Sequence, residues 1–149
     1  MRRLAPLLLA FLLTSCGSDE PARDDGRVPL RIRTAEAEVT LRVEIADTSA
    51  ERAEGLSNRG SVPADAGMAF VWDRPVEADF WMKDTLIPLQ IAFWDDDGRI
   101  VALFEMEACA ADPCPTYGPD EPIVGAAEAN AGWFTEHGVH VGDTVELDA

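Results

Sequence analysis

The stretch FWMKDTLIPLQIAF, residues 80–93, places a lysine and an aspartate inside the most apolar part of the chain after its N-terminal leader. A charged side chain that is buried without a partner or water costs several kcal/mol. Lys83 and Asp84 point to opposite faces if they are neighbours in one strand, so they need not pair with each other. Pro88 cannot donate to a sheet, and we therefore expect the strand to break near Lys83–Thr85.

Aromatic residues precede this break, and aromatic walls with a few polar groups are typical of a ligand cleft. The predicted ligand-binding residues are Arg59, Trp81, Lys83, Asp84, Glu128 and Asn130. Glu128 and Asn130 share a face if their segment is extended. In the alternative interpretation, the charges only hold the fold, and Lys83 pairs with Glu128. Asp84 would then pair with Arg59, and Asn130 would only cap a helix.

The other residues that could do chemistry form no clear catalytic set. His137 and His140 could bind a metal together with Glu136, but their spacing is not that of a helical pair, so we expect surface histidines and no metal site. The run at residues 95–98 does not match a calcium-binding EF-hand loop and is expected to be a solvated turn. There is no G-x-S-x-G nucleophile motif, we expect no cofactor, and catalytic residues stay unassigned.

Short segments must position these side chains. Alternating apolar residues predict strands, which we expect over residues 30–34, 39–46, 68–72, 78–83, 85–94, 99–106, 123–129, 139–141 and 144–147. A capping box at Thr48–Glu51 predicts one short helix, and Asn130 predicts a second over 131–137. The fold class is mainly β, a compact antiparallel sandwich or distorted barrel with two short helices. The absence of strand–helix–strand alternation argues against a nucleotide-binding fold.

The N-terminus is predicted to be a targeting segment. Arg2–Arg3 are basic, and the apolar run Leu4–Leu13 is too short to span a bilayer. The run ends in LTSC, which looks like a bacterial lipobox, so residues 1–15 are predicted to be a lipoprotein signal peptide. Cys16 would carry a diacylglyceryl group and palmitate that anchor the protein in the cell envelope, on the outer side of the cytoplasmic membrane or at the outer membrane. An ordinary secretory signal is the alternative.

Composition divides the rest of the chain. Residues 16–28 are polar and charged and predict a flexible tether, which leaves 29–149 as a single β-rich domain. If Cys16 is lipidated, Cys109 and Cys114 remain, and an even pair outside the cytosol indicates a disulfide. A disulfide that closes a loop this short stabilises the folded protein by about 2 kcal/mol.

The charge balance restricts the partners. The chain has 12 basic and 28 acidic residues, a net charge of −16, and removal of the two leader arginines leaves 10 − 28 = −18. Nucleic acid is excluded as a partner because binding phosphates needs clustered Lys and Arg. Cations, small neutral polar ligands and basic peptides remain as partners. The alternative is that the acidity only keeps the protein soluble.

Several segments resemble the bacterial and archaeal family named domain of unknown function 192, over roughly Val39–Leu147. They are ERAEGLSNR (51–59), GMAFVW (67–72), FWMKDTLIPLQIAF (80–93), DDGRIV (96–101) and EANAGWFTEHGVHVGDTV (128–145). The resemblance implies a compact β-rich domain, often exported, with no established activity or cofactor. It also implies polar family positions at Arg52, Arg59, Lys83, Asp84, Thr85, Glu128, Asn130 and Asp143.

Two positions depart from the family pattern. The resemblance implies Asn where this chain has Asp84, and Asp where it has Gln90, and we interpret this as a carboxylate that has moved. The segment between Cys109 and Cys114 is not general to the family.

Three functional hypotheses follow. The leading one is a membrane-anchored extracytoplasmic binding or accessory module. The second is a hydrolase or lyase in which Glu128 or Asp84 is the acid or base and Lys83 or Arg59 holds an anionic intermediate, and it predicts a carboxyl with a strongly raised pKa in the cleft. The third is a purely structural envelope lipoprotein.

Overall fold

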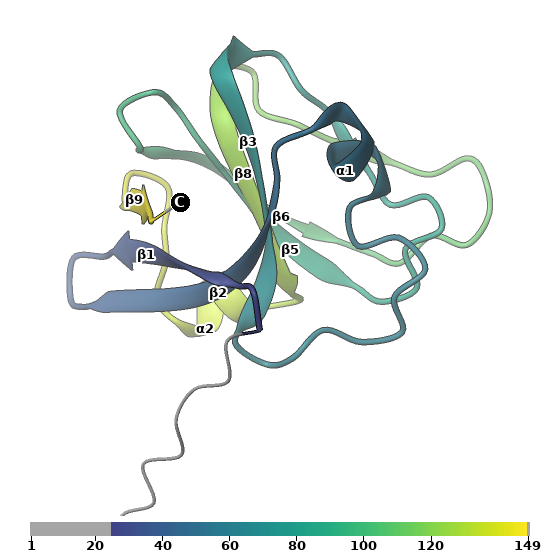
Figure 1. Ribbon diagram of the computed structural model, residues 1–149, viewed down its shortest axis with the longest axis horizontal. Helices are drawn as coiled ribbons and strands as arrows, with labels where there is room; N and C mark the ends of the chain where they lie inside the picture. The colour runs from purple at the N-terminus through teal and green to yellow at the C-terminus, as the bar shows by residue number, and fades with distance from the viewer. Residues whose placement is uncertain (1–24, 149) are drawn as a thin grey trace, which may run out of the picture.

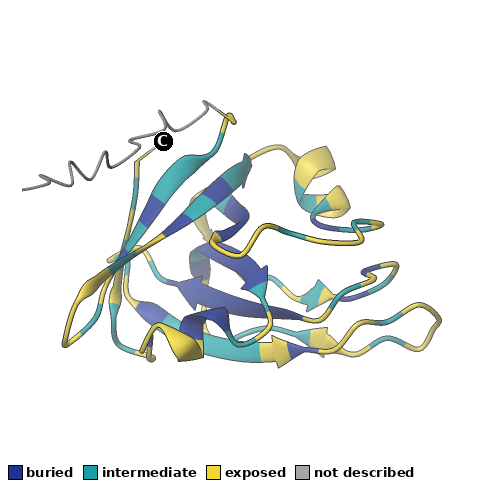
Figure 2. Cartoon of the chain, turned by 90° about the horizontal axis from the view of Figure 1, so that it is seen from below, coloured by how far each residue is buried: buried dark blue, intermediate teal, exposed yellow. Residues whose placement is uncertain are grey.

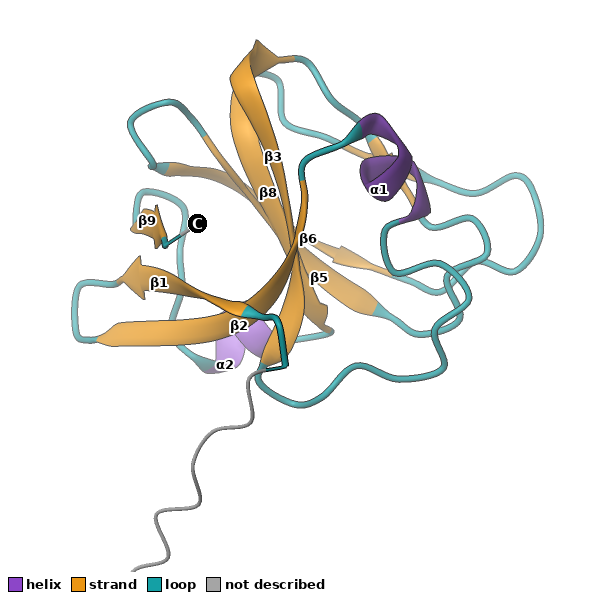
Figure 3. Cartoon of the chain, in the orientation of Figure 1, coloured by secondary structure: helices purple, strands orange, loops and turns teal. Residues whose placement is uncertain are grey.

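A strongly curled sheet of seven strands forms the body of the protein in the computed structural model, which describes residues 25–148 (Figure 1). Its strands are β1 (Val28–Arg33), β2 (Glu38–Ala46), β3 (Ala66–Val76), β5 (Leu89–Trp94), β6 (Ile100–Met106), β8 (Ile123–Asn130) and β9 (Thr144–Leu147). A two-stranded ribbon consists of β4 (Phe80–Trp81) and β7 (Thr116–Tyr117). The helices are α1 (Ser49–Glu54) and α2 (Trp133–Glu136), on separate parts of the sheet (Figure 3). The predicted mainly β fold with two short helices is confirmed.

The strand order is β6-β5-β8-β3-β2-β1-β9, and the two outer strands approach each other. The backbone N–H of Val145 donates to the carbonyl of Gly98 at 2.7 Å, and that of Ile100 to the carbonyl of Asp143 at 2.8 Å. These bonds close one end of the curl, so the architecture is a distorted barrel rather than a sandwich. All neighbours are antiparallel except β2 and β3, which are parallel and joined through α1. The sequence pattern did not predict this parallel pair of strands and its connection through α1.

Strand β5, most of β8 and the first half of β3 are buried on both faces (Figure 2). Side chains alternate across a strand, so Ala127 and Ala129 pack inside the curl with Trp94 and Phe134. The next residue on β8, Glu128, therefore projects to the opposite face. There Met68, Phe70, Ile91 and Phe93 form a second apolar cluster.

Helix α1 begins as predicted. The Thr48 hydroxyl accepts from the N–H of Glu51, and the Glu51 carboxylate accepts from the N–H of Thr48, which completes the capping box. The helix ends at Gly55, whose φ of 52° and ψ of −134° lie in a region that only glycine adopts readily. Gly55 packs next to the Phe70 ring, so a Cβ there would lie 3.4 Å from it.

Four local predictions are wrong. Of the strand predicted over 78–83, only Phe80–Trp81 is a strand. The predicted strand over 85–94 begins only at Leu89, although the expected break at Lys83–Thr85 is confirmed as a turn. Residues 139–141 form no strand, and β9 pairs with β1 instead. The N-cap of α2 is Gly132 rather than Asn130. The strand errors arise because the local pattern does not say which distant strand a segment can reach.

The predicted signal peptide, the lipidation site Cys16 and residues 17–24 of the predicted tether lie outside the described residues, so they stay predictions. Within the tether, Arg27 already belongs to the folded domain, because its guanidinium pairs with Glu44 at 3.2 Å and with Asp25 at 2.8 Å. Among residues 25–148, no helix has the length and apolarity needed to cross a bilayer.

Candidate functional site

A pocket of about 280 Å³ opens between α1, the middle of β3 and the segment that carries β4. Its floor reaches β8. The lining residues are Arg52, Ala53, Glu54, Gly55, Leu56, Ser57, Phe70, Trp72, Ala78, Asp79, Phe80, Trp81, Thr85 and Glu128. The pocket therefore combines an aromatic wall with a small set of polar groups, which is the usual composition of a small-molecule site.

The aromatic wall is made of rings that hold one another edge to face. Phe80 packs against Phe70 with ring centroids 4.8 Å apart and against Trp72 at 6.3 Å. The Arg52 guanidinium lies over the Trp72 ring, 5.1 Å from its centroid, and donates to the carbonyl of Val71 at 3.0 Å and to that of Asp47. Arg52 is therefore fastened to the wall by the backbone and by a cation–π contact.

Glu128 is the most unusual group in the pocket. Its strand partners are Met68 and Ile91, and only 5% of the residue is exposed. Within the described part of the chain its carboxyl has no hydrogen-bond or ion-pair partner, and burial raises its pKa to about 8. A buried carboxyl without a partner carries a large desolvation penalty when ionised. Glu128 is therefore largely neutral at neutral pH and can take up or release a proton there.

Thr85 lines the same pocket and is also 5% exposed. A tight turn holds it, in which its N–H donates to the Met82 carbonyl at 3.0 Å. Cys109 clamps the other side, since its carbonyl accepts from the N–H of Asp84 at 3.1 Å and its N–H donates to the Thr85 carbonyl at 3.3 Å. The predicted disulfide between Cys109 and Cys114 is confirmed, and it closes the loop that supports this turn.

Two of the six predicted ligand residues, Trp81 and Glu128, line the pocket. Lys83 instead pairs with Asp112 and lies 6.0 Å from the Trp81 ring centroid. Asp84 is exposed at a φ of 57°, in the left-handed region, and lines no described pocket wall. The alternative pairing of Lys83 with Glu128 is wrong.

Arg59 and Asn130 serve the fold. Both terminal nitrogens of Arg59 bond the Glu44 carboxylate at 2.8 Å, so the alternative pairing with Asp84 is also wrong. This contact, together with Arg27, lowers the pKa of Glu44. The Asn130 amide donates to the carbonyls of Val62 and Pro63 at 3.2 and 3.0 Å, and so it ties a loop to the end of β8.

Sequence reasoning missed most of the pocket wall. Phe70 and Trp72 were read only as parts of a strand, and Asp79 carried no signal at all. For Arg52 and Thr85 a signal existed, because both fall on polar positions of the resembling family. The residues after a capping-box helix were another signal, since the end of α1 forms one side of the pocket.

Gln90 lies on the other face of the sheet from Glu128, with its carbonyl oxygen accepting from the N–H groups of Phe134 and Thr135 at 2.7 and 3.2 Å. Its amide donates to the Thr135 hydroxyl at 2.7 Å. Gln90 therefore caps α2 from a distance. Gln90 bonds α2, whereas Asp84 lies in the turn before β5, so the two positions have different surroundings. That a carboxylate moved from position 90 to position 84 stays an interpretation.

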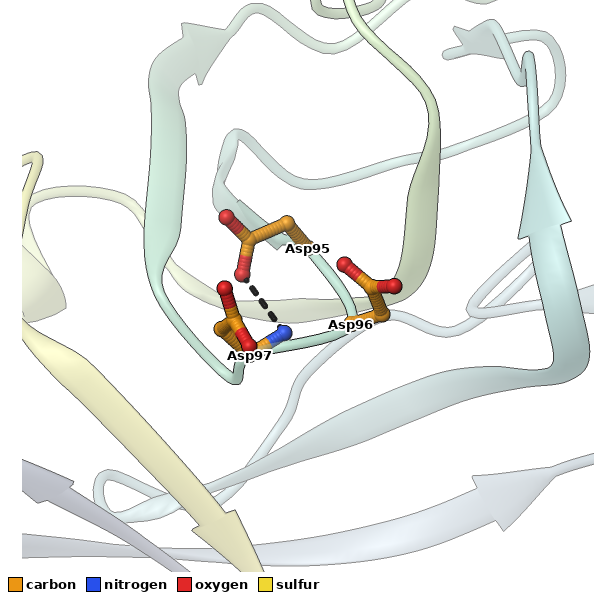
Figure 4. Close-up of side chains that lie close together, drawn as sticks. All are labelled: Asp95, Asp96 and Asp97. Carbon is orange, nitrogen blue, oxygen red and sulfur yellow. Dashed lines mark hydrogen bonds between the residues drawn. The ribbon is translucent and has the colours of Figure 1, made fainter.

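The three aspartates 95–97 gather at the turn between β5 and β6 (Figure 4). The Asp95 carboxylate accepts from the N–H groups of Asp97 at 3.0 Å and Arg99 at 2.9 Å, so it holds the turn itself. The predicted turn is confirmed. His137 stacks on Trp133 with centroids 4.2 Å apart, while the N–H of His140 donates to Asp143, so the two histidines have separate local contacts.

Comparison with known proteins agrees with this architecture. The family model DUF192, described as uncharacterized ACR, matches residues 30–147. No curated protein matches the chain. A crystal structure from Sinorhizobium meliloti 1021, described as that of a candidate transcription regulator, is similar at 30% identity with a TM-score of 0.74, over 81% of this chain and 93% of that one. A protein of unknown function from Novosphingobium aromaticivorans DSM 12444 is similar at 33% identity and a TM-score of 0.74, over 80% and 84%.

Proposed function

The chain belongs to the DUF192 family, and we propose that it is a membrane-anchored extracytoplasmic lipoprotein that binds a small polar ligand in the pocket lined by Glu128. The observation that carries this proposal is the carboxyl of Glu128, a residue that is only 5% exposed, which has no partner among the described residues and faces an open pocket. An ionisable group held this way destabilises the fold, so it is most simply explained by a ligand that needs it.

The Sinorhizobium structure is described as a candidate transcription regulator, and we do not propose that role for this chain. Twenty-eight acidic residues against twelve basic ones repel a phosphate backbone, and affinity for nucleic acid depends on neutralising phosphates. We therefore keep nucleic acid out of the proposal.

A pair of tryptophan substitutions on α1 tests the pocket. Ala53 lines the pocket and is exposed, so Ala53→Trp blocks the mouth without entering the core. Ala50→Trp, on the same helix but outside the pocket, is the matched control. In a thermal-shift screen of polar metabolites, ligands that stabilise the wild type should lose at least tenfold in affinity with Ala53→Trp and keep it with Ala50→Trp. Identical responses of the two variants to every stabilising ligand would reject the pocket and favour a structural lipoprotein.

The membrane anchor has its own test. Cys16→Ser removes the thiol that lipid would modify, and the variant should leave the membrane fraction and lose labelling by radioactive palmitate in the expressing bacterium. A wild-type protein that is unlabelled and fractionates with Cys16→Ser would contradict the anchor and leave the pocket untouched.

A hydrolase or lyase is the second candidate function, favoured by the pKa of Glu128 near 8, because a general acid works best when its pKa lies near the operating pH. Asp84 and Lys83 do not take part in this version, since neither lines the pocket. A substrate screen of esters, amides and glycosides should then give turnover that Glu128→Gln abolishes. Turnover that survives in Glu128→Gln would exclude Glu128 as the acid.

A further inference from the structure

We infer that the ligand carries an alkylammonium group, whose positive nitrogen lies between the aromatic wall and the carboxyl of Glu128. The inference rests on the proposed binding function and adds the chemical class of the ligand. Its basis is the arrangement of charge and rings in the pocket.

The first step is the missing counter-ion. Glu128 is buried at the floor of the pocket, and none of residues 25–148 gives its carboxyl a hydrogen bond or an ion pair. An ammonium that enters the pocket would supply the partner, and ion pairs strengthen where water is excluded. An anionic ligand would instead meet Glu128, with Asp79 and Glu54 also in the lining, which is unfavourable.

The second step is the aromatic wall. Ring faces carry negative potential and attract cations within about 6 Å of the centroid. Both indoles of the pocket already show this preference, since Arg52 lies over Trp72 and the Lys83 ammonium lies 6.0 Å from Trp81. Phe70 and Phe80 line the interior and have no such cation among the described residues. Phe80 is only partly buried and is therefore the ring that the ligand would contact, with the buried Phe70 packed behind it.

The third step is the balance of charge around Glu128. From α1 come Arg52 and Glu54, from the segment before β4 comes Asp79, and β8 contributes Glu128 itself. Among residues 25–148, Arg52 is the one cation in the lining, and it is fixed over Trp72 by the carbonyls of Val71 and Asp47. Two further carboxylates at the mouth and a net charge of −16 draw cations toward the opening.

The fourth step is size. A volume of about 280 Å³ is at the small end of the range for ligand pockets. A short amine or the end of a lysine side chain fits such a space, whereas a large cationic polymer could place only one group in it. The proposal is therefore a single ammonium on a short aliphatic stem.

The test uses pairs of probes that differ in charge. Tetramethylammonium and n-butylammonium are compared with tert-butanol and n-butanol by tryptophan fluorescence and by chemical shifts, in wild type, Glu128→Gln and the control Glu36→Gln, whose side chain is exposed on the β1–β2 turn. Each cation should bind at least tenfold more tightly than its alcohol. Glu128→Gln should remove most of this preference, and Glu36→Gln should keep it.

The pH profile separates a local role of Glu128 from a general effect of acidity. Tetramethylammonium has no titratable proton, so its affinity should rise by up to tenfold per pH unit up to about pH 8, where Glu128 ionises, and then level off. In Glu128→Gln the profile should be flat. Calorimetry in buffers of different ionisation enthalpy should detect up to one proton released per cation bound at pH 7.

Each other outcome overturns the inference. Equal binding of alcohols and cations, or cation binding that Glu128→Gln leaves unchanged, rejects the ligand class. The pocket itself is tested separately by Ala53→Trp. Absence of binding by both cations at millimolar concentration also rejects the class. If Ala53→Trp and Ala50→Trp respond identically to every ligand, the proposed function fails as well, so the two failures are distinguishable.

Discussion

Lys83 is ion-paired with Asp112, a residue inside the loop that the Cys109–Cys114 disulfide closes. The backbone of Cys109 also bonds Asp84 and Thr85. The disulfide loop thus supports the turn in the middle of residues 80–93. Thr85, whose carbonyl accepts from the N–H of Cys109, also lines the pocket.

The double substitution Cys109→Ala and Cys114→Ala should lower the free energy of unfolding by about 2 kcal/mol, because the unfolded chain is no longer closed into a short loop. Urea unfolding measures this change. The amides of Asp84 and residue 109 should also exchange hydrogen faster. Lys83→Met is the control, since its pair with Asp112 is partly exposed and its loss should change stability little. Unchanged protection of both amides would show that the turn does not depend on the disulfide.

Glu128→Gln should stabilise the protein, and increasingly so as the pH rises. The pKa of Glu128 is about 8 in the folded state against 4.5 for the ordinary group. Between these values the folded protein keeps a proton that the unfolded chain has lost, so wild-type stability falls with pH by at most about 1.4 kcal/mol per unit. Unfolding curves from pH 5 to pH 9 should show a gap between variant and wild type that widens up to about pH 8. A gap that is constant with pH would contradict the burial of an ionisable carboxyl.

Asp84 should tolerate only residues that suit its backbone. Its φ of 57° lies in the left-handed region, which Gly, Asn and Asp adopt readily and other residues adopt only at a steric cost. Asp84→Asn and Asp84→Gly should leave unfolding within about 0.5 kcal/mol of wild type, whereas Asp84→Ala should cost about 1 kcal/mol. Chemical denaturation distinguishes these outcomes. A large loss with Asp84→Asn would mean that the charge, rather than the backbone, is what the position needs.

Gln90→Ala should destabilise the protein by about 2–3 kcal/mol, since it leaves the buried N–H of Phe134 and the N–H of Thr135 without their acceptor. Thr135→Val removes only the hydroxyl contact and should cost about 1 kcal/mol. Denaturation curves compare the two, and the helical signals of α2 in NMR spectra should weaken in Gln90→Ala alone. Equal effects of the two substitutions would assign the cap to the hydroxyl instead.

The mainly β fold follows from the sequence because alternation of side chains along a strand is a local property. The capping box at Thr48, the turn at Asp95 and the break after Trp81 were predictable for the same reason. Each depends on residues that are close in the chain. The pairing of Cys109 with Cys114 belongs here too.

The candidate site could be predicted only in part. Trp81 and Glu128 were identified from an aromatic near a break and from a lone acid in an alanine-rich strand. The ion-pair partners expected for Lys83 and Arg59 were wrong, because an ion pair is decided by which segments meet in space, and the actual partners Asp112 and Glu44 lie in distant segments. The spacing of residues along the chain does not show which distant segments come into contact.

By itself, the sequence determined most strands of the main sheet and which face of β8 Glu128 occupies, since both follow from period-two alternation. Only the tertiary structure decided that this face meets α1 and the segment before β4 across a pocket, with no partner for the carboxyl among the described residues. The physical reason is that burial and pKa depend on the packing of residues remote in sequence, whereas the direction of a side chain depends on its own backbone.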